Sequence, residues 1–181
     1  MFSFLTIYFH LYHSLCKAKA LLAAARAGAD LLDIPGNMFT NEEFELTSDA
    51  EAVAKQRGLI DEIHSLGKKV LMSSHMDRFM TQQEVLDIAK AQQDRGADVL
   101  KIVTKSNTAK ELTDNLEITR VLAERMSAPI LFLSSGDMCR LHRVAGPYLG
   151  CCMWLATFEA GRKDQPLLSD LKPMLERFEN F

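Results

Sequence analysis

The sequence predicts an α/β fold with a parallel sheet, because short apolar runs alternate with helix-forming segments along the chain. Gly67 and Gly96 each stand between a helical segment and an apolar run, as glycine does just past a helix end. The phrase Ala-Gly-Ala-Asp at residues 27–30 returns as Arg-Gly-Ala-Asp at residues 95–98 in the same place. We therefore expect about five strand–helix units in a single domain that covers residues 1–181.

The predicted strands are continuous apolar runs, as parallel strands are when both faces of the sheet are covered. Ser48 and Thr81 each stand three residues before a glutamate, which is a capping-box pattern, and Asn107 or Thr108 is expected to cap a third helix. The predicted strands are Ala29–Ile34, Lys68–His75, Ala97–Thr104, Pro129–Ser134 and Gly150–Thr157. The predicted helices are Ala18–Ala27, Asp49–Leu66, 81–95, 108–126, Met138–Val144 and Pro166–Phe178.

The first 15 residues are apolar but contain no lysine or arginine, so they lack the basic start of a signal peptide. They are also shorter than the ~20 apolar residues that a transmembrane helix needs. We expect an apolar helix over residues 1–17 that runs into the next helix. This segment could also cover an open edge of the sheet.

Composition argues against several classes of function. The net charge of -3 lacks the basic excess of a nucleic-acid surface. The four cysteines form no CxxC pair, and we expect them as small buried side chains in a reducing cytoplasm. His64 and His142 fall in helical stretches and are expected at the surface. We expect a cytoplasmic protein with no metal site and no membrane partner.

Polar residues gather where the predicted strands end, which is where both an open doubly wound sheet and a (β/α)8 barrel place their sites. No GxGxxG or GxxxxGK[ST] pattern is present, so dinucleotide and P-loop sites lack support. Lys101 lies inside an apolar run, and an unpaired buried ammonium is costly, which favours a neutral, nucleophilic amine. His75 ends the preceding run and is suited to general acid–base work. The alternatives are a lysine that reaches back to water and a histidine packed in the core.

Together these runs resemble type I 3-dehydroquinate dehydratase, the Schiff-base dehydratase of the shikimate pathway. The resemblance extends from about Ala18 to Leu171. The segments that carry it are Gly28–Asp33, Val70–His75, Ala97–Ile102, Leu133–Gly136 and Arg140–Gly146.

The resemblance implies a partial (β/α)8 TIM barrel, of which this chain corresponds to the later five-eighths and lacks the N-terminal part. A five-strand segment leaves two exposed parallel edges, which favours association and makes a homodimer one expected assembly.

The resemblance also implies a lyase reaction in the route to chorismate and the aromatic amino acids. Lys101 would form an imine with the ketone of 3-dehydroquinate, and His75 would act as general base and then as general acid. Arg143 would bind the substrate carboxylate, with Arg140 as the alternative. Gln165 would bind substrate from the last loop, and Asp33 matches an acidic position at a strand end. No cofactor is implied, because the imine itself withdraws electrons.

The sequence departs from the family pattern in two respects. The family carries a glutamate that orients the histidine, together with further acidic and arginine residues, and nothing in Met1–Ala27 supplies them. The serine expected four residues before the glutamine falls at Gly161. Loss of an orienting residue costs orders of magnitude in rate. The open alternatives are therefore another Schiff-base lyase of the aldolase type and a non-catalytic remnant that acts as an interaction module.

Overall fold

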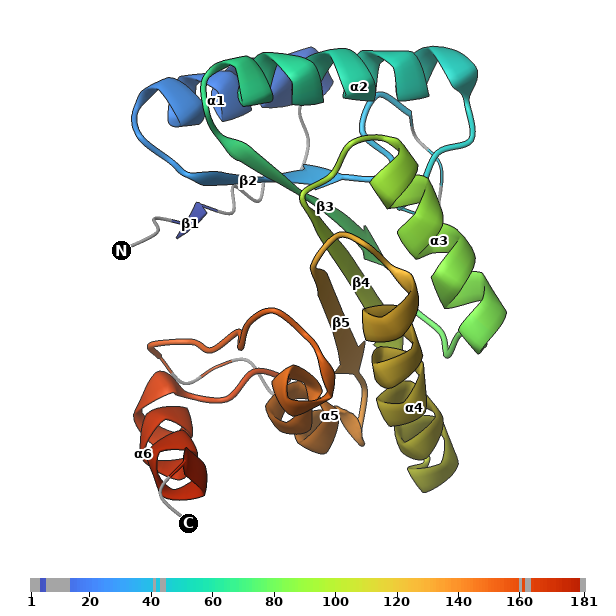
Figure 1. The fold of residues 1–181 in the computed structure, drawn as a ribbon, viewed down its shortest axis with the longest axis vertical. Helices are drawn as coiled ribbons and strands as arrows, with labels where there is room; N and C mark the ends of the chain where they lie inside the picture. The colour runs from blue at the N-terminus through green and yellow to red at the C-terminus, as the bar shows by residue number, and fades with distance from the viewer. Residues whose placement is uncertain are drawn as a thin grey trace.

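The structure is a computed structural model that describes residues 4–5, 14–40, 42, 45–159, 161 and 164–179. In these residues five strands form one sheet in chain order, and every neighbouring pair is parallel (Figure 1). The strands are β1 (Phe4–Leu5), β2 (Leu31–Pro35), β3 (Lys69–His75), β4 (Val99–Lys105) and β5 (Ile130–Ser135). The helices are α1 (Ser14–Arg26), α2 (Ala50–Ser65), α3 (Gln82–Asp94), α4 (Ala109–Arg125), α5 (Cys139–Ala145), the 3-10 helix η1 (Gly146–Leu149) and α6 (Leu168–Glu179).

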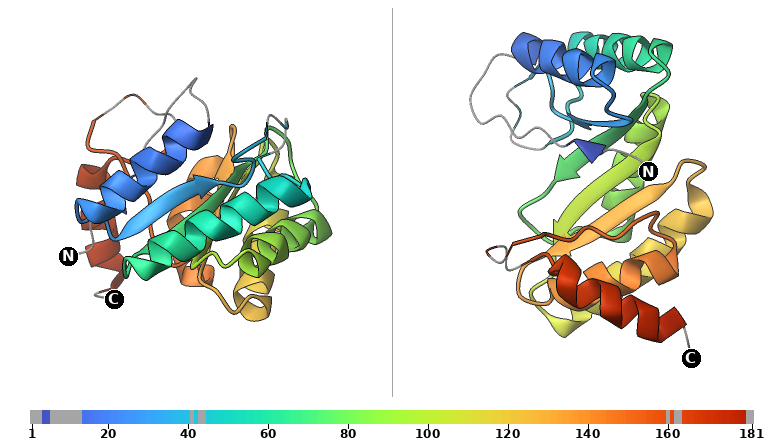
Figure 2. Two further views of the ribbon diagram at one scale, coloured as in Figure 1. Left: turned by 90° about the horizontal axis from the view of Figure 1, so that it is seen from above. Right: turned by 90° about the vertical axis from the view of Figure 1, so that its left-hand side faces the viewer.

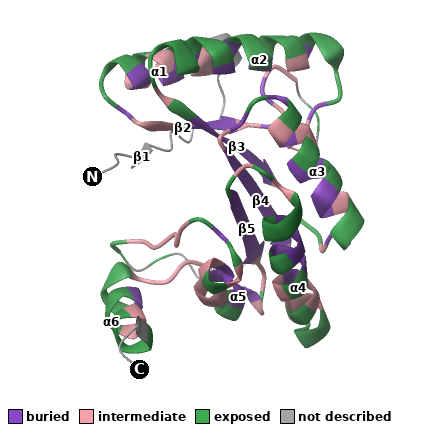
Figure 3. Cartoon of the chain, viewed as in Figure 1, coloured by how far each residue is buried: buried purple, intermediate pink, exposed green. Residues whose placement is uncertain are grey.

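The sheet has two apolar faces, as the continuous apolar strands predict. Helices α1 to α4 pack on the outer face and bury the larger cluster, which includes Ile34, Met72 and Phe132 (Figure 2). The inner face holds a smaller cluster, against which the segment after β5 packs. Its members are Leu71, Val99, Val103, Leu131 and Leu133, with Leu31, Met153 and Leu155 packed against them. Strands β3 to β5 are buried almost throughout, and the exposed residues lie on the outer sides of the helices (Figure 3).

Capping residues set the starts of three helices. Thr81 and Thr108 each form a complete capping box with the glutamate three residues on, which confirms both predictions. Asp49, not Ser48, is the N-cap of α2, and its side chain accepts a hydrogen bond from the backbone N–H of Ala52. A carboxylate one residue further along caps as well as a serine hydroxyl, so the pattern located this helix to within one residue.

The predicted last strand, Gly150–Thr157, is wrong for most of its length. Only Cys151 bridges the sheet, opposite Ile130, where the backbone N–H of Cys152 donates to the carbonyl of Ile130. Thr157 instead pairs with Leu167, next to the start of α6. The apolar residues that looked like a strand cover the inner face without extending the ladder.

The predicted N-terminal helix over residues 1–17 is wrong at Phe4 and Leu5 and confirmed at residues 14–17. Phe4 and Leu5 pair as a strand with Leu31 and Leu32, and helix α1 begins only at Ser14. Residues 1–3 and 6–13 of that prediction lie outside the described residues. Phenylalanine favours the extended conformation, and the edge of β2 offers unpaired backbone groups. The idea that this segment covers an open edge is therefore confirmed for these two residues.

Among the described residues, no helix combines the length and the apolar character that crossing a bilayer requires. All four cysteines are free. Cys139 and Cys151 are buried as expected, whereas Cys16 and Cys152 are exposed, so the prediction that all four are buried is wrong for two of them. Periodicity alone did not show that these two thiols lie on outward-facing positions.

Candidate active site

Lys101 lies in the middle of β4 and is 4% exposed. Its Nζ donates to Oδ2 of Asp33 at 3.1 Å. Asp33 belongs to β2, so the two side chains meet across the intervening strand β3. The buried ammonium is thus paired, which corrects the sequence argument that treated it as unpaired, and it does not reach back to water. Oδ1 of Asp33 is also buried and accepts no hydrogen bond from the described part of the chain.

His75 is the last residue of β3 and shares the inner face with Lys101. Ser73 lies opposite Lys101 in the register, and His75 follows two places later, so all three side chains point to the same side. From strand spacing and rise, the Cα atoms of His75 and Lys101 lie roughly 8 Å apart. An amine and an imidazole at this separation can reach one small substrate from adjacent strands.

Glu45 is the partner of His75, and no sequence pattern predicts this pair. Its Oε2 accepts from the backbone N–H of His75 at 3.0 Å and lies 2.5 Å from Nδ1 of the same residue. Glu45 comes from the loop between β2 and α2, not from the N-terminal segment where an orienting glutamate was sought. When neutral, the imidazole carries its proton on Nδ1 toward this carboxylate and leaves Nε2 as the base. Thirty residues of sequence separate the pair, and no periodic pattern links a loop glutamate to a strand-end histidine.

Arg143 is held at the end of β5 by two hydrogen bonds. Its Nε donates to the carbonyl of Ser134 at 2.7 Å, and its Nη2 donates to Oδ2 of Asp164 at 3.0 Å. Gln165 follows Asp164 in the chain and lines a pocket together with the exposed Arg140. The structure therefore links Arg143 to the loop that carries Gln165, and it leaves Arg140 at the surface.

His142 is fully buried, so the expectation that it lies at the surface is wrong. Its Nδ1 lies 2.5 Å from Oγ of Ser134 and its Nε2 lies 2.7 Å from Oγ1 of Thr119. Burial, with a smaller contribution from the neighbouring Arg143, lowers the pKa of His142 to about 4. Helix α5 is short and packs one side on both β5 and α4, which encloses this position. His64 is partly exposed and pairs with Asp98 at 2.7 Å.

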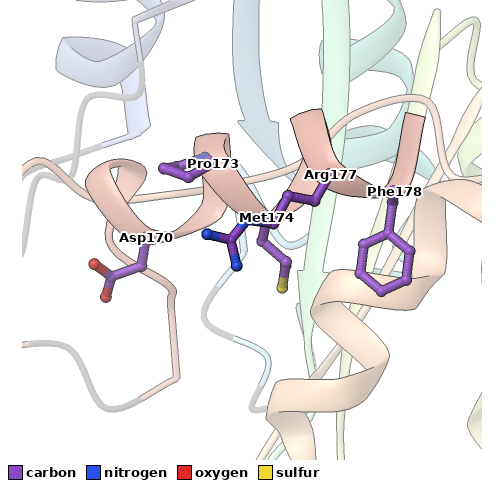
Figure 4. Close-up of a pocket in the computed structure, with 5 residues that line it drawn as sticks. All are labelled: Asp170, Pro173, Met174, Arg177 and Phe178. Carbon is purple, nitrogen blue, oxygen red and sulfur yellow. The ribbon is translucent and has the colours of Figure 1, made fainter. Parts of the chain in front are cut away.

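A separate surface pocket lies along α6. All of the residues that line it come from this one helix (Figure 4): Asp170, Pro173, Met174, Arg177 and Phe178. It contains no residue of β2 to β5, but Asp170 and Met174 also line the pocket that holds Gln165.

The chain is similar to known proteins in sequence and in fold. A family model described as type I 3-dehydroquinase matches residues 14–180. This chain belongs to the type I 3-dehydroquinase family. The 3-dehydroquinate dehydratase of Klebsiella pneumoniae is 27% identical over 157 residues, which cover 84% of this chain and 57% of that protein. The 3-dehydroquinate dehydratase of Enterococcus faecalis is 29% identical over 175 residues, covering 95% and 61%. The chain thus spans about three-fifths of these curated relatives.

Solved structures of the family share the fold. The type I 3-dehydroquinate dehydratase of Clostridium difficile, solved with covalently modified comenic acid, gives a TM-score of 0.82 at 18% identity and covers 97% of this chain and 68% of that one. The enzyme of Enterococcus faecalis gives 0.73 at 22% identity, covering 94% and 63%. A dihydrodipicolinate synthase of Acinetobacter baumannii, complexed with pyruvate, gives 0.53 at 13% identity, covering 85% and 54%. At these identities the likeness concerns the fold, which is a partial (β/α)8 TIM barrel.

Proposed function

We propose that this chain converts 3-dehydroquinate to 3-dehydroshikimate and water through an imine on Lys101, with His75 as general acid and base. The observation that carries the proposal is that Lys101 and His75 lie on the same face of adjacent strands, with Lys101 paired to Asp33 and His75 paired to Glu45. Membership of the dehydroquinase family supports the choice of substrate. The two side chains alone would serve any carbonyl substrate.

The first step is attack of the lysine on the ketone. The ammonium gives up a proton, for which the Asp33 carboxylate at 3.1 Å is the nearest acceptor, and Nζ then bonds to the carbonyl carbon. The proton held by Asp33 then passes to the carbinolamine hydroxyl, which leaves as water and gives a protonated imine. The cationic imine draws electrons from the neighbouring carbon and acidifies its proton, so the lysine supplies the electron sink that a cofactor would otherwise provide.

The second step belongs to His75. Its Nε2 takes the proton from the carbon next to the imine, and the electron pair moves into the imine to give an enamine. The enamine then expels the substrate hydroxyl, which leaves as water with the proton from His75. Water finally hydrolyses the imine and releases product and free Lys101. Glu45 stabilises the imidazolium that forms between the two proton transfers.

Arg143 and Gln165 are the proposed ligands of the substrate. A planar guanidinium binds a carboxylate through two parallel hydrogen bonds, which matches the acid group of dehydroquinate. In the structure Arg143 already binds the carboxylate of Asp164. Substrate would therefore take the place of Asp164, and the adjoining Gln165 would move with that loop.

Reductive trapping tests the proposal. Borohydride added with 3-dehydroquinate should reduce the imine and leave substrate-derived mass on the tryptic peptide that contains Lys101. Lys101→Met should abolish the adduct, and Lys105→Met, which removes a second lysine of the same strand, should keep it. A folded protein that gives no adduct would contradict the proposal. An adduct with pyruvate but not with dehydroquinate would favour an aldolase-type lyase instead.

A further inference from the structure

Arg95 is a buried cation that has not entered the mechanism. It follows α3 and is 8% exposed. Its Nη1 donates to the carbonyl of Gly36 at 3.1 Å and to Oε1 of Gln56 at 2.9 Å, and its Nη2 donates to the carbonyl of Thr47 at 2.5 Å. All three acceptors are neutral, and burial lowers the pKa of Arg95. A charge buried on neutral acceptors is costly, so the contacts it makes need an explanation.

Those contacts close the loop between β2 and α2. Gly36 directly follows β2, and Thr47 lies just before the Asp49 cap of α2, so one guanidinium binds both ends of the loop. The backbone N–H of Thr47 also donates to the carbonyl of Gly36 at 3.0 Å. The Gln56 amide donates a third hydrogen bond to the Gly36 carbonyl and another to the carbonyl of Met38, both at 2.9 Å. Arg95 and Gln56 thus hold the loop ends in one arrangement.

Glu45 lies two residues before Thr47 in this closed loop. The hydroxyl of Ser74 donates to the Glu45 carbonyl at 2.5 Å, and Gln92 of α3 donates to that hydroxyl at 3.0 Å. A Cβ at Gly36 would lie 2.4 Å from the same carbonyl oxygen, so only glycine fits beside it. The backbone of Glu45 therefore packs closely between the end of β2 and β3, and its carboxylate is hydrogen-bonded to the ring of His75.

We propose that Arg95 is a positioning residue for the reaction: by binding both ends of the loop between β2 and α2, it holds Glu45 on Nδ1 of His75 and so fixes the tautomer and direction of the catalytic base. The proposal rests on the proposed role of His75. The side chain of Arg95 contacts the loop and α2, so it acts on His75 only through Glu45.

The test combines a spectroscopic measurement on the substrate-free protein with kinetics. In protein labelled with 15N-histidine, the ring nitrogens of His75, assigned by comparison with His75→Gln, should report one tautomer with the proton on Nδ1. Arg95→Met should mix the two tautomers and lower kcat by about 10- to 100-fold, as a small misplacement of a catalytic group does. KM should change by less than about twofold, because Arg95 lies away from the proposed substrate ligands. Borohydride should still trap substrate on Lys101.

Three comparisons make the result specific. Arg125→Met removes an exposed arginine of α4 and should change neither the tautomer nor kcat. In a Glu45→Ala background, Arg95→Met should lower kcat no further, because both act through one contact. Arg95→Lys keeps the charge but cannot bridge Gly36 and Thr47, and it should give an intermediate tautomer mixture and kcat.

A folded Arg95→Met protein with an unchanged tautomer and kcat would overturn the inference, and so would additive losses in the double variant. If Arg95→Met does not fold, the His75 tautomer and kcat are measured in Arg95→Lys instead. Wild-type values of both in Arg95→Lys would overturn the inference. Absence of dehydroquinate turnover by the wild-type protein would contradict the proposed function instead, and the nitrogen spectra would still report on Arg95.

Discussion

Lys101 and Asp33 form a buried ion pair whose side chains are 5% and 6% exposed. Removing one member of such a pair leaves an uncompensated charge and costs about 3–5 kcal/mol, so each side chain depends on the other for stability as well as chemistry. His75 and Glu45 form a second pair that is about one-third exposed. The first pair is buried in the sheet, whereas the second lies where β3 ends and is partly open to solvent.

The sequence predicts Lys101, His75 and Asp33 as site residues, but it does not predict that Glu45 pairs with His75 or that Arg95 binds the loop that carries Glu45. Lys101 inside an apolar run and His75 at a strand end are visible because a polar residue interrupts a pattern. Glu45 and Arg95 interrupt no pattern: one lies in an acidic loop, and the other follows a helix where an exposed arginine is ordinary. Their roles depend on contacts between segments 30 to 59 residues apart.

His142 makes stability depend on pH. Its pKa is lowered to about 4 in the folded protein from an ordinary value of 6.5, so the unfolded chain binds the proton more readily between these values. The stability that neutral His142 contributes is complete above pH 6.5 and is lost as the pH falls toward 4. Between pH 7.5 and 5.5 the wild-type protein should lose about 1.4 kcal/mol relative to His142→Gln, which does not titrate.

Urea unfolding of both proteins at the two pH values measures this difference. Carboxylates titrate equally in the two proteins and cancel in the comparison. An identical stability difference at pH 7.5 and 5.5 would contradict the assignment of a buried, neutral imidazole.

Among the elements, helices were easier to predict than the last part of the sheet. Glycine stops and capping boxes are local signals, and they located α2, α3 and α4 closely. The sequence of a short apolar run does not show whether another strand pairs with it. Residues 150–157 therefore have the pattern of a strand, although they pack over the inner face of the sheet. Phe4 and Leu5 were placed in a helix for the same reason, because strand pairing depends on an edge that the local sequence does not show.

The loop before α6 should control access of substrate to Arg143. Asp164→Asn keeps the shape of the side chain but removes the carboxylate that competes for the guanidinium. We expect KM for dehydroquinate to fall roughly 3- to 10-fold, the range of a partly buried ion pair, with kcat nearly unchanged. Asp61→Asn, an exposed change in α2, serves as the control in steady-state kinetics. An unchanged or higher KM in Asp164→Asn would show that this ion pair does not stand in the substrate's place.

For the whole molecule, the α/β class, the parallel order and the partial barrel followed from the alternation of strands and helices and from the family resemblance. The chain spans about three-fifths of the curated relatives it matches, and its own loop supplies a glutamate to the histidine. The homodimer and the cytoplasmic location stay predictions. Strands β2, β3 and β4 and the loop after β2 bring Lys101, Asp33, His75 and Glu45 close together.

We propose that Lys101 and His75 act on one substrate from one face of the sheet. A crystal structure of the borohydride-reduced adduct with dehydroquinate would show whether they do. We expect the substrate ring to be bonded to Nζ of Lys101, with the carbon that loses its proton facing Nε2 of His75 and Glu45 still on Nδ1. A ring bonded to another lysine, or bonded to Lys101 with His75 turned away from it, would contradict the proposed roles.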